Sequence, residues 1–200
     1  MTGKYPPRFG ITDFIPGMRP GKLLSAPNAT HLPLAETTLA EALRDGGYAT
    51  FFAGKWHLGA GEFFPGAQGF PSELAGNGQF FYPKSATPPP NPKDDPKTTD
   101  RIVSDAVAFI NAHPDKPFFA YLALQAPHDP FQLPDNWRDR YAGRYAAGYD
   151  ALRVSRIERM KQLGILDSTA TVFPRLLTIP AWADLSDEER RQSARRMELY

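Results

Sequence analysis

Two stretches of the chain repeat the same order of hydrophobic and polar positions, a helix pattern followed by an apolar strand pattern. In the first, TTLAEALRDGG predicts a short helix, because Thr38 and Glu41 form a capping box and the Gly46–Gly47 pair ends the periodic run. The apolar and aromatic run YATFFA, residues 48–53, then predicts a strand.

The second stretch has the same design. TTDRIVSDAVAFINAHP predicts a helix that stops at Pro114, with apolar residues at helical spacing: Ile102, Val103, Ala106, Phe109 and Ile110. FFAYLALQ, residues 118–125, is nearly continuously apolar, which predicts a strand buried on both faces. A helix and then a buried strand, twice, predict an α/β domain with a mostly parallel sheet and flanking helices.

The remaining segments are simpler. The first thirty residues are rich in Gly and Pro and predict a long surface loop, and PKSATPPPNPKDDPK, residues 83–97, predicts an exposed Pro-rich loop. GYDALRVSRIERMKQLG predicts a helix over 148–164. A last helix is predicted after the capping box formed by Ser186 and Glu189.

Composition narrows the class of protein. The 200 residues are 42% hydrophobic and carry a formal net charge of +1, which suits one domain with a core and gives no electrostatic footprint for nucleic acid. The chain has no cysteine, so a thiolate metal site is excluded. No apolar run reaches the length of a membrane-spanning helix, and no signal peptide is visible after Met1.

Both predicted strands end in a loop that carries histidine, GKWHLG after the first and APHDP after the second. Because ligands bind at the carboxyl ends of parallel strands, we expect Lys55, His57 and His128 to meet at one edge of the sheet. An ammonium and two imidazoles there would suit a sulfate or phosphate group. We interpret Trp56 as packing under the loop, and His31 and His113 as structural.

The same segments carry a family resemblance. GKWHLG, preceded by LAEALRDGGYATFFA, resembles the second signature of the type I sulfatases, the arylsulfatase-like branch of the alkaline phosphatase superfamily. TGKYPPRFG is similar to the segment that follows the family's nucleophile motif, and PFFAYLALQAPHDPFQLP to the strand that leads to a substrate-binding histidine. YAAGYDALRVSRIERMKQLGIL resembles a stretch of bacterial arylsulfatases. The matches run in family order from Met1 to about Leu166.

The resemblance implies roles for the three residues. Lys55 would hold a sulfate oxygen and the nucleophile's oxygen, His57 would contact the nucleophile, and His128 would bind sulfate and protonate the leaving alcohol or phenol. It also implies a small-molecule sulfate ester as substrate, a calcium ion, and a formylglycine nucleophile made from the Cys or Ser of a C/S-x-P-x-R motif.

The sequence departs from the family at several points. The C/S-x-P-x-R motif is expected just before TGKYP, and the near-match SAPNA, Ser25–Ala29, has no arginine. We interpret Asp94–Asp95 and Asp135–Asn136 as turns and not as calcium ligands. We therefore expect residues 1–200 to form an incomplete N-terminal catalytic domain, a partial alkaline-phosphatase/sulfatase-like sandwich. It would lack the first strand, the C-terminal part, the nucleophile and the calcium ligands, and would be inactive alone.

Two alternatives to a sulfate ester hydrolase stay open. One is a phosphate or phosphonate monoester hydrolase of the same superfamily, and the other is a non-catalytic anion-binding remnant. The sequence leaves the compartment open, although the resemblance is compatible with a periplasmic or secreted enzyme.

Overall fold

The computed structural model describes residues 1–15, 17, 21–75, 98–129, 131, 133 and 135–200. The predicted Pro-rich loop at 83–97 lies outside these residues. The chain divides into two compact units, residues 1–128 and residues 129–200, and each is described by itself.

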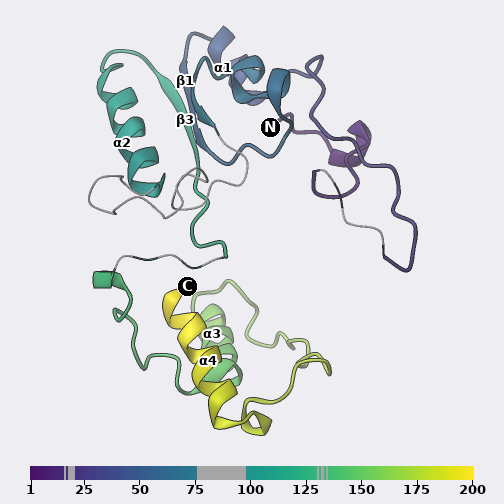
Figure 1. Ribbon diagram of the computed structural model, residues 1–200, viewed down its shortest axis with the longest axis vertical. Coiled ribbons are helices and arrows are strands. Elements are labelled where there is room, and N and C mark those ends of the chain that lie inside the picture. The colour runs from purple at the N-terminus through teal and green to yellow at the C-terminus, as the bar shows by residue number, and fades with distance from the viewer. Residues whose placement is uncertain (16, 18–20, 76–97, 130, 132, 134) are drawn as a thin grey trace, which may run out of the picture. The chain divides into compact units, whose positions relative to one another are not determined.

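The first unit is built on a small parallel sheet. Its strands are β1 (Ala49–Gly54), β2 (Ser72–Ala75) and β3 (Phe118–Ala123), in the order β2-β1-β3, with β1 parallel to both neighbours. Helices α1 (Leu39–Asp45) and α2 (Thr98–Asn111) lie on opposite sides of the sheet (Figure 1). The predicted α/β class with a parallel sheet and flanking helices is therefore confirmed.

The central strand β1 is buried along its whole length, and its alternating side chains feed two separate cores. Ala49, Phe51 and Ala53 pack against the α2 residues Ile102, Ala106 and Phe109. On the other face, Phe52 packs with Ala40 of α1 and with Trp56 and Phe70. Burial on both sides explains why the sequence of this strand is continuously apolar.

Strand β3 differs from its prediction. Its side chains are half-buried or exposed, and Phe118, Tyr121 and Leu122 each keep 40% or more of their surface accessible, so burial on both faces is wrong for this strand. The reason is its position, because β3 pairs with β1 on one side and forms an edge of the sheet among the described residues.

The start of α1 is fixed by the predicted capping box. The Thr38 hydroxyl accepts from the Glu41 N–H at 3.1 Å, and the Glu41 carboxylate accepts from the Thr38 N–H at 2.7 Å. The same hydroxyl, buried, donates to the Gln68 carbonyl oxygen at 2.7 Å. One threonine thus joins the helix to the segment that precedes β2.

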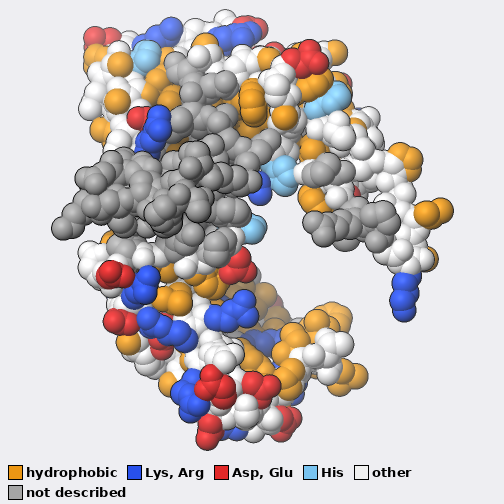
Figure 2. All heavy atoms as spheres, in the orientation of Figure 1, with side chains coloured by type: hydrophobic (Ala, Val, Ile, Leu, Met, Phe, Trp, Pro, Cys, Tyr) orange, Lys and Arg blue, Asp and Glu red, His pale blue; other side chains and the backbone are white. Residues whose placement is uncertain are grey.

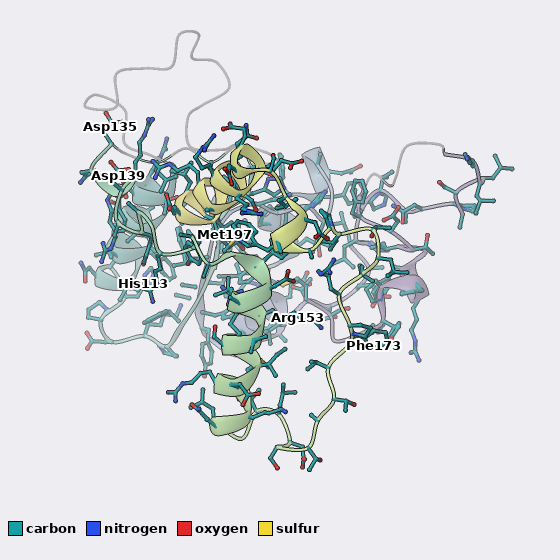
Figure 3. The ribbon with its side chains drawn as sticks, turned by 90° about the horizontal axis from the view of Figure 1, so that it is seen from below. His113, Asp135, Asp139, Arg153, Phe173 and Met197 are labelled. Atoms are coloured by element: carbon teal, nitrogen blue, oxygen red, sulfur yellow. The ribbon has the colours of Figure 1, made fainter. Side chains whose placement is uncertain are left out.

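The second unit contains helices α3 (Gly148–Gln162) and α4 (Asp187–Leu199), both at positions that the sequence predicts. The Asp150 carboxylate accepts from the Trp182 N–H at 2.8 Å, and Trp182 packs edge-on against Tyr149 at 5.2 Å between ring centroids. Arg153 of α3 points to the loop that carries Phe173 and donates to its carbonyl oxygen (Figure 3).

Charge also orders the end of α4. Hydrogen bonds from the Arg195 guanidinium and from the Gly143 N–H hold the pKa of Glu198 below its ordinary value. Among the described helices of both units, none has the length and apolar character needed to span a bilayer.

Substitution of Thr38 tests the junction between α1 and the rest of the first unit. We expect Thr38→Val to lower the free energy of unfolding by about 2 kcal/mol, because it removes a helix cap and leaves a buried carbonyl without its donor. Thr38→Ser keeps the hydroxyl and is the matched control. Urea unfolding of both variants measures the difference, and equal stability of the valine and serine variants would contradict the assignment.

Candidate anion site

The candidate site begins where β1 and β3 end side by side. Gly54, the last residue of β1, is paired with Ala123, the last residue of β3, and the Lys55 N–H donates to the Ala123 carbonyl oxygen at 2.9 Å. His128 lies on the turn that follows β3, where its N–H donates to the Gln125 carbonyl oxygen at 3.0 Å. The loops that carry Lys55, His57 and His128 therefore leave the same edge of the sheet.

Only glycine allows this approach of the two strands. Gly54 has a φ of +115°, and a Cβ at this position would lie 2.1 Å from the Ala123 carbonyl oxygen. Since that oxygen belongs to the backbone and is hydrogen-bonded to the Lys55 N–H, it cannot move aside cheaply. The glycine before Lys55 is therefore required for the geometry that joins the two loops.

The loop after β1 is anchored by its tryptophan. Trp56 is only 4% exposed, packs edge-on against Phe52 at 5.1 Å between centroids, and donates from Nε1 to the Phe63 carbonyl oxygen at 2.8 Å. The interpretation that Trp56 packs under the loop is confirmed. The burial of this side chain fixes the loop between Lys55 and His57 to the core.

His31 and Phe63 close the far side of the same loop. Their rings stack with centroids 3.7 Å apart, and a Cβ on Gly59 would come within 2.9 Å of the His31 Cβ and 2.6 Å of the Phe63 Cβ. These contacts support a structural role for His31. His113 lies in the turn before β3 and packs on Phe109 at 4.5 Å between centroids, which also fits a structural role.

His57 has an unusual backbone. Among the described residues it is the only non-glycine residue with a positive φ, +58°, in the left-handed region that side chains rarely adopt. Its Nε2 donates to the Ile15 carbonyl oxygen, and the ring of Phe14 lies 6.4 Å away between centroids. Such backbone conformations are held by surrounding contacts and are common at functional sites.

Lys55 provides a positive charge at this edge of the sheet. The Lys55 side chain is partly buried, and it takes part in none of the ion pairs found among the described residues. Histidine side chains reach the surface of the molecule (Figure 2). In the described part of the chain, the carboxylates and histidines form no cluster of three that could hold a metal ion.

The other acidic candidates do not change this picture. Asp94–Asp95 lie outside the described residues. Asp135 and Asn136 begin a short 3-10 helix, Asp135–Trp137, and the Asp135 carboxylate pairs with Arg138 at 3.2 Å. The described residues therefore do not fit the calcium site that the family resemblance implies.

Sequence reasoning missed Phe14, Ile15 and Asn28. All three belong to the segment predicted only as a surface loop, and no periodic pattern or motif there indicates a contact with His57. The one signal available was an aromatic residue inside a Gly- and Pro-rich segment.

Comparison with known proteins gives a consistent answer. The sequence model of the Sulfatase family matches residues 1–197. The chain is 35% identical over 187 residues to an arylsulfatase of Klebsiella aerogenes, covering 82% of this chain and 39% of that enzyme. It is 33% identical over 187 residues to an uncharacterised sulfatase of Schizosaccharomyces pombe, covering 81% of this chain and 34% of that protein.

A solved structure shares the fold. The crystal structure of Ps i-CgsB in complex with k-i-k-neocarrahexaose matches with a TM-score of 0.56 and 24% identity, over 71% of this chain and 36% of that chain. The chain belongs to the sulfatase family. It spans less than half the length of these relatives.

Replacement of Gly54 tests the strand junction. We expect Gly47→Ala to cost about 1 to 2 kcal/mol, because Gly47 has a φ of +90° and open space around it. Gly54→Ala adds the collision with the Ala123 carbonyl and should cost about 2 kcal/mol more. Denaturant unfolding of the two variants measures the gap, and equal losses of stability would show that β1 and β3 do not approach this closely.

Proposed function

We propose that this chain supplies the cationic half of the active site of a sulfate ester hydrolase. The observation that carries the proposal is the pairing of Gly54 with Ala123, which starts the Lys55–His57 loop and the His128 loop from adjacent strand ends. Membership of the sulfatase family and the relatives named arylsulfatase support sulfate as the group that binds.

Each residue has a role that its chemistry supports. The Lys55 ammonium is a compact positive charge with three donors, which suits an oxygen of a tetrahedral anion. His128, exposed on its turn, would bind a second sulfate oxygen and give a proton to the departing alcohol or phenol. His57, held by the Ile15 carbonyl, would contact the nucleophile.

Two further groups belong to the proposed enzyme but not to the described residues. Family membership supports a metal-dependent enzyme in general, and calcium with a formylglycine nucleophile is our expectation for the full-length protein. No C/S-x-P-x-R motif occurs in the 200 residues, and the described carboxylates and histidines form no cluster that fits a metal ion.

Two other functions compete with this proposal. A phosphate or phosphonate monoester would bind through the same charges, and the arylsulfatase relatives favour sulfate over it. A non-catalytic anion-binding role would use the same charges without turnover. The next two experiments separate these cases.

Anion binding is tested by NMR of the four histidines, observed through their ¹³C-labelled Cε1 groups during titration with inorganic sulfate. We expect the His57 and His128 signals to shift together and to saturate with one dissociation constant. The signal of His113, which precedes β3 and so lies at the opposite end of that strand, should stay in place. Lys55→Met should weaken binding at least about tenfold, because a charge next to the anion is lost.

Lys116→Met is the matched control, because Lys116 lies in the same turn as His113 and its loss removes the same charge. Shifts of all four histidines alike, or equal effects of the two lysine variants, would show non-specific binding and refute the site. Phosphate run beside sulfate at equal ionic strength tests the competing monoester.

Turnover is a separate question. We expect the 200-residue chain to bind 4-nitrophenyl sulfate without hydrolysing it, because its sequence holds no C/S-x-P-x-R motif from which formylglycine could form. The release of 4-nitrophenol in the presence of calcium measures this, with His57→Ala as the control. Hydrolysis well above the His57→Ala rate would contradict the expectation and assign another nucleophile.

A further inference from the structure

The Asn28 side chain joins two parts of the N-terminal segment. Asn28 accepts with Oδ1 from the N–H groups of Thr12 at 2.8 Å and Asp13 at 3.1 Å, and donates from Nδ2 to the Phe14 carbonyl oxygen at 3.0 Å. A backbone hydrogen bond joins nearby residues on each side, from the Ala29 N–H to the Gly10 carbonyl oxygen at 2.8 Å. The segment Thr12–Phe14 is therefore fixed by three hydrogen bonds to one side chain 14 to 16 positions further along the chain.

These hydrogen bonds to Asn28 set the position of Phe14 and Ile15. The Ile15 carbonyl oxygen accepts from His57 Nε2, and the Phe14 and His57 rings lie 6.4 Å apart at an angle of 48°. The two residues come from the N-terminal loop and His57 from the loop after β1, so the contact joins segments 42 positions apart. An aromatic ring is thus held beside an imidazole of the candidate anion site.

The Phe14 ring is not part of the core. It is 54% exposed, and it belongs to neither of the two buried clusters of the first unit. Many apolar side chains of this chain are exposed, but Phe14 lies beside a histidine of the candidate anion site, where its open face can meet the organic part of a bound ester.

A sulfate ester has two parts, and the charges explain only one of them. Lys55 and the histidines suit the anionic head, whereas the organic group attached through the ester oxygen needs an apolar surface beside that head. The Phe14 ring offers such a surface, and a flat ring packs on it better than a small alkyl group does.

We propose that Phe14, positioned by Asn28, is a specificity-determining residue that selects sulfate esters whose ester oxygen is attached to a ring with a flat apolar face. Both an aryl ring and a sugar ring have such a face. This inference rests on the proposed function, because it uses the same anion site.

The test compares esters of equal charge on the whole chain. Dissociation constants for methyl sulfate, phenyl sulfate and galactose 4-sulfate are measured by the histidine NMR titration, with inorganic sulfate as reference. The wild type should bind one or both ring-bearing esters about tenfold more tightly than methyl sulfate. The ester that shows the gain identifies the kind of ring.

Three variants assign the preference, and a fourth is their control. Phe14→Ala should abolish it, measured as the ratio between the dissociation constants of each ester and of inorganic sulfate in the same variant, and Phe14→Tyr should retain it. Asn28→Ala should lose the preference although Asn28 itself touches no substrate, since it holds Phe14 in place. Leu24→Ala is the matched control, because Leu24 lies in the same loop and is 99% exposed.

The outcomes separate the two claims. If the wild type binds neither inorganic sulfate nor any ester, the proposed function fails and this inference fails with it. If inorganic sulfate binds but the ring-bearing esters gain nothing over methyl sulfate, or Phe14→Ala keeps the gain, only this inference is overturned. Saturable binding of inorganic sulfate to Phe14→Ala shows that the variant is folded.

Discussion

The close parallel approach of β1 and β3 is the constraint on which the candidate site depends. Gly54 meets Ala123 at a distance that leaves no room for a side chain, and the Lys55 N–H continues the ladder onto the Ala123 carbonyl. Without this contact the loops of Lys55 and His128 would have no common origin, because 73 positions separate these residues in the sequence. Backbone geometry therefore starts the loops that carry the candidate residues from one edge of the sheet.

The candidate site also requires a rigid loop after β1, and the core of the first unit makes this loop rigid. Trp56 stands between Lys55 and His57 in the sequence, and its side chain is buried. Any movement of either neighbour relative to the sheet would therefore expose the indole. His57 is held in a left-handed conformation by contacts from the N-terminal loop. The same loop carries Phe14, so the histidine that would contact the nucleophile lies beside the surface that would select the ester.

Much of the fold follows from local sequence signals. The capping boxes at Thr38 and Ser186 place two helix starts correctly, and the apolar runs before Lys55 and before Gln125 are the strands β1 and β3. Strand β2 was not predicted, because its four residues show neither alternation nor β-branched side chains. The exposure of β3 was also missed, since strand order decides burial and the sequence of an edge strand can be as apolar as that of a central one.

The candidate site could also be predicted only in part from the sequence. The motifs indicate Lys55, His57 and His128, whose meeting at one edge stays a prediction supported by the strand pairing. Phe14 and Asn28 have no such signal, because their importance arises from contacts across the fold. The most direct test is a crystal structure of the chain with selenate, located by its anomalous scattering. We predict one selenate within about 3 Å of the Lys55 ammonium and the His128 imidazole, with the His57 ring next to it. A selenate bound elsewhere, or a His128 ring turned away from the anion, would contradict this assignment.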